Sequence, residues 1–214
     1  MAVVTSSEVI NTGYAILALV ADALVLLTII FLVASRTSPG LRERWGRFRD
    51  IVSPFAVQAA WIVAVLATFG SLFLQYVEHF DPCDFCWFQR ICMYPLSLLL
   101  GIAAFRGNIE VAKRYFIGLS SVGAVIAIYH YQLEHVPHEL SVCGGVVPCN
   151  VAVINVFGFI SVPFLSMAAF LLITTLLLVA RGRDDSEYED EEEVDVIDGS
   201  VDVDHGDDAL PAPA

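Results

Sequence analysis

Five long apolar runs, separated by charged or cysteine-bearing segments, constrain the fold of this 214-residue chain more than any other feature. A hydrocarbon core about 30 Å thick is crossed by a helix of about 20 apolar residues, and these runs have that length or come close to it. The mean hydropathy of +0.70 is far above that of a soluble domain of this size. The sequence therefore predicts an all-α integral membrane protein.

The predicted spans form a four-helix transmembrane bundle core with an additional N-terminal transmembrane helix. The first run is too long for a signal peptide and has no Lys or Arg before it, so it is predicted to remain as a helix. Pro54 suits the first turn of the second span, and Pro95 interrupts the third. The spans are placed at residues 14–34, about 55–77, about 87–105, about 115–131 and 163–180.

The last apolar stretch, residues 151–180, would be about 45 Å long as a single helix, which is too long for a simple crossing. Pro163 is therefore predicted to divide it. Residues 163–180 then span the membrane, and residues 151–162 are expected to lie in the outer interface as a short helix.

All basic clusters fall on one predicted side of the membrane. They lie after the first span (residues 36–49), between the third and fourth spans (106–114) and at the end of the last span (181–183). The positive-inside rule assigns this side to the cytoplasm. The opposite segments, 78–86 and 132–150, hold no Lys or Arg and contain four of the five cysteines. We therefore expect a multi-pass protein of the cell membrane with these cysteines and the N-terminus outside and the C-terminus inside.

The formal charge of −13 is confined largely to the end of the chain, because fourteen of the 24 acidic residues lie between Asp184 and Asp208. The charge therefore says little about a substrate. We expect three parts: residues 1–54 as the extra helix and a basic cytoplasmic loop, 55–183 as the four-helix core, and 184–214 as a disordered acidic tail.

Two cysteine pairs sit at the water-exposed ends of predicted spans, Cys83 with Cys86 and Cys143 with Cys149. Two pairs that meet in space can pass oxidising equivalents by thiol–disulfide exchange. Cys86 lies near the start of a helix, where unpaired amides favour a thiolate, and Arg90 one turn later can face the same sulfur. A contact between Arg90 and lipid phosphate is the alternative.

The second pair encloses five residues, and such a small ring contributes only about 2 to 2.5 kcal/mol as a staple. An exchangeable disulfide is therefore favoured over a structural one. A zinc site built from all four thiolates is a further alternative. Cys92 is assigned no role, since a lone thiol in an apolar helix is usually a packing residue.

Two other polar residues fall within the predicted spans. Asp22 lies in the middle of the first span and is expected to face the bundle. His130 lies near the outer end of the fourth span, at about the membrane depth of Cys86 and Arg90. It could pass a hydrogen bond or a proton to a reduced acceptor, or simply bond to the backbone.

These motifs resemble the DsbB family of disulfide bond formation proteins, the quinone-dependent membrane thiol oxidases. The resemblance covers roughly residues 55–180. It rests on the run Pro82-Cys83-x-x-Cys86-x-x-x-Arg90, on the later loop pair, and on residues 157–164. The order of the cysteine pairs disfavours the related vitamin K epoxide reductase-like proteins. The extra first helix departs from the family pattern, and the short second loop is like that of Gram-positive and archaeal members.

The resemblance implies catalysis by Cys83, Cys86, Cys143 and Cys149. A thioredoxin-like thiol oxidase of the DsbA type would be the partner, reoxidised by the Cys143/Cys149 disulfide. The electrons would pass to Cys83 and Cys86 and then to a lipid quinone of the menaquinone or ubiquinone type. Arg90 and His130 are expected at the quinone. The alternative function is a zinc-binding or disulfide-stapled membrane scaffold without turnover.

Overall fold

The computed structural model describes residues 6–106, 112–135, 147–149 and 155–180. Within these ranges five helices are long and apolar enough to cross a membrane, which confirms the predicted all-α membrane protein. The predicted acidic tail, Arg181, Arg183 and Cys143 lie outside the described residues.

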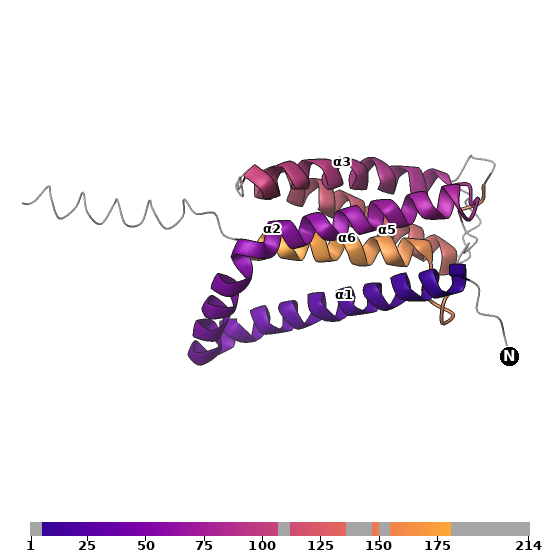
Figure 1. Ribbon diagram of the computed structural model, residues 1–214. Coiled ribbons are helices and arrows are strands. Elements are labelled where there is room, and N and C mark those ends of the chain that lie inside the picture. Colours follow the sequence, from indigo (N-terminus) through magenta and orange to yellow (C-terminus); the bar gives the residue numbers. More distant parts are fainter. Residues whose placement is uncertain (1–5, 107–111, 136–146, 150–154, 181–214) are drawn as a thin grey trace, which may run out of the picture. The chain divides into compact units, whose positions relative to one another are not determined.

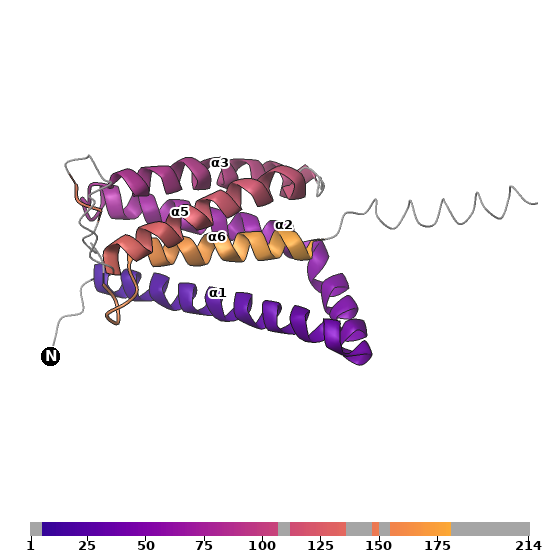
Figure 2. The ribbon, with the colours of Figure 1, turned by 180° about the vertical axis from the view of Figure 1, so that it is seen from behind.

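The helices follow one another along the bundle in alternating directions (Figure 1). Helix α3 packs on α2 and α5, and α6 packs on α2, α5 and α1. Helix α1 lies along α2 and α6, and the view from behind shows α3 and α5 on the side away from it (Figure 2). The elements are α1 (Ser6–Thr37), α2 (Pro39–Tyr76), α3 (Asp84–Arg106), the π-helix η1 (Ala112–Phe116), α5 (Ile117–His135) and α6 (Val162–Val179).

The prediction that Pro54 lies in the first turn of the second helix was wrong. Helix α2 begins at Pro39, which occupies its first turn, and continues through Pro54. A proline inside a helix removes one hydrogen bond and crowds the preceding turn, so it kinks the helix more often than it ends it. Figure 1 shows α2 bending between its basic N-terminal part and its membrane span. Helix α3 likewise passes through Pro95 without a break.

Helices α5 and α6 approach closely because a glycine faces an aromatic ring. A Cβ added to Gly123 would lie 2.3 Å from the Phe170 ring, so only glycine fits there. Next to this contact the Ser120 hydroxyl donates to the Phe170 carbonyl at 2.9 Å and lies 2.8 Å from the Thr174 hydroxyl. Small residues and interhelical hydrogen bonds of this kind hold helices together where lipid offers no hydrophobic contrast.

The connection into α6 is a tight turn. Pro163 lies in the first turn of α6, as predicted. Residues 155–161 form no helix, however: Val156 and Ile160 pair as an isolated bridge, with Phe157 and Gly158 at φ +56° and +85°. These left-handed residues close the turn and prevent a helical path. The predicted interfacial helix is therefore wrong for 155–161, and residues 150–154 lie outside the described part of the chain.

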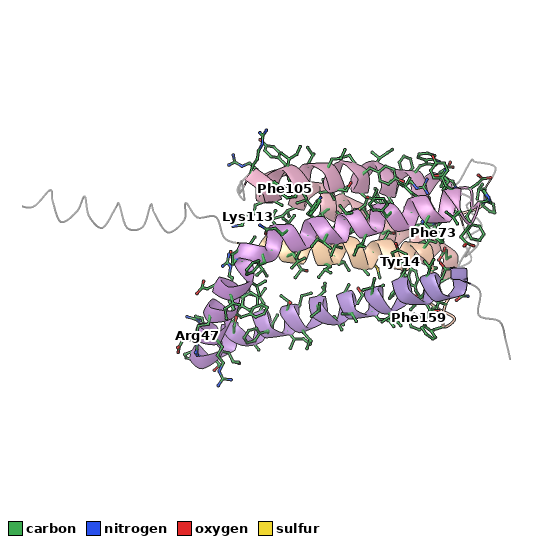
Figure 3. All side chains as sticks on the ribbon, viewed as in Figure 1. Tyr14, Arg47, Phe73, Phe105, Lys113 and Phe159 are labelled. Atoms are coloured by element: carbon green, nitrogen blue, oxygen red, sulfur yellow. The ribbon has the colours of Figure 1, made fainter. Side chains whose placement is uncertain are left out.

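The two ends of the bundle differ in chemistry. Arg47 and Lys113 lie at one end, and Tyr14, Phe73 and Phe159 lie toward the other (Figure 3). At the basic end Arg49 Nε donates to the Val179 carbonyl at 3.2 Å and so satisfies the C-terminus of α6. Cys83 and Cys86 lie at the opposite end, where α3 begins.

Candidate functional site

Cys83 and Cys86 stand at the start of α3. Cys83 precedes the helix, and its carbonyl accepts the first helical hydrogen bond, from the Trp87 amide at 3.1 Å. Cys86 follows within the first turn. The two sulfurs are 3.0 Å apart, and both thiols are free. The start of the helix therefore brings together the pair that the sequence singled out, here in its dithiol form.

His130 reaches this pair from the end of α5. Its Nε2 lies 3.6 Å from Cys83 Sγ, and the residue is only 3% exposed. The Phe85 ring lies 5.6 Å from the imidazole ring, centroid to centroid. The sequence placed His130 at the depth of Cys86, but its direct contact is with Cys83.

A chain of hydrogen bonds behind His130 determines which nitrogen of its ring carries the proton. Ser166 Oγ donates to Gln89 Oε1 at 2.6 Å, which leaves the amide Nε2 of Gln89 pointing at His130 Nδ1, 3.0 Å away. The amide nitrogen can only donate, so Nδ1 accepts and the proton of the neutral ring is on Nε2. His130 thus presents an N–H donor to Cys83. Gln89 and Ser166 were not predicted as site residues from the sequence.

The environment of Cys83 favours its thiolate. Hydrogen bonding with Cys86 is the largest effect and burial opposes it, while the contact with His130 adds to the stabilisation; together these lower the pKa of Cys83 to about 4. The helix start was expected to favour a thiolate at Cys86. The structure places the stabilised thiolate at Cys83 instead, because Cys83 receives both the neighbouring thiol and the imidazole.

Arg90 is buried, and its guanidinium is turned toward α2. It donates from Nε to Ser71 Oγ at 2.8 Å, from Nη2 to the Ser71 carbonyl at 3.0 Å, and from Nη1 to Gln75 Oε1. Its Cζ also lies 5.3 Å from the Trp87 ring centroid. The expectation that Arg90 would face the Cys86 sulfur directly is not met by a hydrogen bond among the described contacts. Three of the five guanidinium N–H groups are used in these contacts, which hold the side chain in place.

Cys86 and Arg90 share a cavity of about 310 Å³ between α1, α2, α6 and the start of α3. His130 is not among the described residues that line it. The cavity therefore meets one sulfur of the pair, and the imidazole meets the other. Besides Cys86 and Arg90, its polar lining comprises Asn11, Tyr14, Ser71, Asp81, Gln89, Tyr94 and Ser166, and its remaining lining is predominantly apolar.

A family model described as "Disulfide bond formation protein DsbB" matches residues 53–180, which hold this site and all of α3, α5 and α6. The chain belongs to the DsbB family. It is accordingly a multi-pass membrane thiol oxidoreductase of disulfide bond formation. Helix α1 lies outside the matched region.

Several relatives of this DsbB-family chain carry similar names. It is 44% identical over 127 residues to Disulfide bond formation protein C of Bacillus subtilis, covering 58% of this chain and 91% of that one. A Probable disulfide formation protein of Oceanobacillus iheyensis is 46% identical over 125 residues, 56% of this chain and 86% of the relative. One from Coxiella burnetii is 40% identical over 133 residues, 61% and 90%. No solved structure matches the chain.

The remaining predicted site residues of this DsbB-family protein are placed as follows. Cys149 is buried and disulfide-bonded, while Cys143 lies outside the described residues. A zinc site made from four thiolates would need Cys149 reduced, so this structure does not form it. Cys92 is a free thiol in the buried core, in agreement with a packing role, and Asp22 is partly buried.

Proposed function

We propose that this DsbB-family protein oxidises a thioredoxin-like thiol oxidase of the DsbA type and passes the electrons to a lipid quinone. The observation that carries the proposal is the division of the cysteine pair. Cys86 lines a cavity between membrane-spanning helices, and Cys83, 3.0 Å away, faces His130 at the end of the bundle.

In the first exchange, the partner's dithiol attacks the disulfide that includes Cys149, at Cys143 through a mixed disulfide, and leaves as a disulfide. Cys143 and Cys149 are then a dithiol. They reduce the Cys83–Cys86 disulfide in turn, so that the same two electrons and two protons now reside on Cys83 and Cys86.

In the structure Cys83 and Cys86 are both free thiols, as they would be after this exchange. Cys83 is stabilised as a thiolate by Cys86 and by the N–H of His130, and this makes it a good leaving group in exchange with the loop pair. Cys86 keeps its sulfur at the cavity. Regeneration of the Cys83–Cys86 disulfide releases two electrons and the proton of the Cys86 thiol; the second proton is the one that Cys83 gave up to solvent when it became a thiolate.

The residues around Cys86 fit a quinone. Tyr94 lines the cavity and its buried hydroxyl has no hydrogen-bond partner among the described residues, and the Arg90 guanidinium lines the same cavity. Both can donate to a carbonyl oxygen. A bound quinone would accept the two electrons and two protons, and the chain's own contribution is to hold Arg90, through Ser71 and Gln75, in a fixed orientation beside Cys86.

The sidedness and the domain limits are part of the proposal. Because the basic residues of α2, η1 and the end of α3 lie at the end opposite Cys83, the positive-inside rule puts the thiol end outside. The partner then meets the protein on the oxidising side. Residues 55–183 would be the redox core, 1–54 the added helix with its basic segment, and 184–214 a cytoplasmic tail.

The test is anaerobic quinol formation by purified protein supplied with a reduced DsbA-type oxidase, comparing wild type with Cys86→Ser and Cys92→Ser. Quinol formed by wild type and Cys92→Ser, with none from Cys86→Ser, supports the relay. No quinol from any of the three, with a partner shown to be reactive, rejects it.

Zinc content of the same samples tests the alternative function, a zinc-binding membrane scaffold without turnover. Cys83, Cys86 and His130 place their ligand atoms within 4.8 Å of one another, so stoichiometric zinc without turnover would favour a metal-binding protein.

A further inference from the structure

We propose that α1 forms one wall of the quinone site and holds the apolar tail of an isoprenoid quinone, which makes this helix a determinant of tail-length specificity. The inference rests on the proposed function and goes beyond it, because α1 lies outside the region matched to the family.

The cavity changes character along α1. Asn11 and Tyr14 line it, and the Tyr14 ring lies over Gly70, the neighbour of the Ser71 that binds Arg90. Leu17, Val20 and Leu24 line it farther along α1. At 1.5 Å per residue, the stretch from position 11 to 24 covers about 20 Å. An isoprenoid quinone matches this lining, because it has a polar redox-active head and a long apolar tail.

The wall is held in place at two points. The Tyr14 ring lies over Gly70 of α2, where an added Cβ would come within 3.0 Å of the ring. Ala18 and Ala21 pack on Ala168 of α6 and form a small buried cluster of their own. These contacts fix α1 against both helices that form the other sides of the cavity.

The position of Cys86 selects the occupant. A phospholipid acyl chain could fill the apolar length, but it has no group that would use Arg90 or accept electrons from the sulfur at the polar end. A soluble thiol partner has no apolar chain that would occupy a cavity between membrane helices. A lipid quinone uses both ends of the cavity.

The experiment compares two quinones, one with a single isoprene unit and one with several, as acceptors for the full-length protein with dithiothreitol as electron donor. Leu24→Trp places bulk in the apolar part of the cavity. Leu26→Trp is the matched control, since Leu24 and Leu26 are 50% and 59% exposed on the same helix and Leu26 does not line the cavity.

We expect the ratio of KM for the long-tailed quinone to KM for the short-tailed one to rise about fivefold in Leu24→Trp and to stay at the wild-type value in Leu26→Trp. An unchanged ratio in Leu24→Trp, or an equal rise in both variants, overturns the inference while leaving the proposed function in place. Absence of quinol from wild type with either quinone overturns the proposed function itself.

A second measurement uses the wild-type protein and so does not depend on how a variant folds. A quinone with a photoreactive group at the tail end should crosslink to the peptide that contains residues 17–24. Crosslinks found on α3 or α5 but absent from α1 would overturn the proposal.

Discussion

His130 Nε2 lies 3.6 Å from Cys83 Sγ, so the C-terminal end of α5 meets the N-terminal end of α3 across 47 positions of sequence. This contact gives the two cysteines different surroundings. One sulfur has an imidazole donor at the end of the bundle, and the other has a membrane cavity. A dithiol divided in this way can exchange with a protein partner on one side and with a lipid-soluble acceptor on the other.

The Cys83 thiol should be alkylated by iodoacetamide at a rate that is nearly independent of pH between pH 5 and 8. Its pKa of about 4 lies below the ordinary value near 8.5, so the reactive thiolate is present throughout this window and is lost only as the pH falls through about 4. Site-resolved mass spectrometry of reduced protein measures the rate. A rate that climbs tenfold per pH unit up to pH 8 would contradict the prediction.

Substitutions at Cys86 and His130 should raise the pKa of Cys83 in a fixed order. Hydrogen bonding with Cys86 is the largest stabilising effect, so Cys86→Ala should shift the alkylation midpoint upward more than His130→Ala. Cys86→Ser keeps a hydroxyl donor and should shift it less than Cys86→Ala. If His130→Ala gives the larger shift, the thiolate is held mainly by the imidazole.

Gln89→Leu should alter both stability and the behaviour of Cys83. The variant removes the Gln89 donor from His130 Nδ1, while Ser166 Oγ keeps the Val162 and Pro163 carbonyls as acceptors, and an unsatisfied buried polar group costs about 1–3 kcal/mol. It also releases the constraint on the ring tautomer, so the Cys83 midpoint should rise. Thermal unfolding in detergent and the alkylation profile check the two effects, and a lower Tm with an unmoved midpoint would mean that Gln89 only supports packing.

Tyr94→Phe should leave the Tm equal or slightly higher, because it removes a buried hydroxyl that has no partner in the structure. If that hydroxyl donates to a quinone, KM for the quinone should rise several-fold with kcat little changed. Steady-state quinone kinetics beside a melting curve test this. An unchanged KM would exclude the Tyr94 hydroxyl from the site.

Gly123→Ala should destabilise the bundle although alanine is the better helix former. The added methyl would meet the Phe170 ring at 2.3 Å, and overpacking of this kind costs about 1–3 kcal/mol. Gly118→Ala on the same helix is the control, since nothing lies within 4 Å of its added Cβ. Equal Tm values for the two variants would show that α5 and α6 separate easily.

The spans could be predicted from hydropathy because lipid demands long apolar helices regardless of tertiary detail. Pro163 could be placed at the start of a helix, but Pro54 could not be placed inside one. A proline fits either position, and the polar residues that continue α2 before Pro54 carry no membrane signal. The turn at 155–161 was missed because it depends on left-handed residues at Phe157 and Gly158, and only the glycine suggests this.

The cysteine pair and the helix that carries it could be recognised from local spacing. The partners of Arg90 and Gln89 could not, because Ser71, Gln75 and Ser166 come from other helices and depend on which helix faces meet. Gln89 could have been predicted as a buried hydrogen-bonding residue, because an amide within the apolar start of a span needs a partner in the bundle. Its neighbour Arg90 was predicted as a site residue because it belongs to the cysteine motif.

Helix α1 touches α6 through Ala18, Ala21 and Ala168, with Phe164, Leu165 and Leu172 packed around them. Ala168 is two residues from Ser166, whose hydroxyl donates to Gln89, so this contact adjoins the cavity side of the site. The hydrogen bonds described at Cys83, His130 and Gln89 use no side chain of α1. Helix α1 therefore shapes the surroundings of Cys86 and leaves those of Cys83 to α3, α5 and α6.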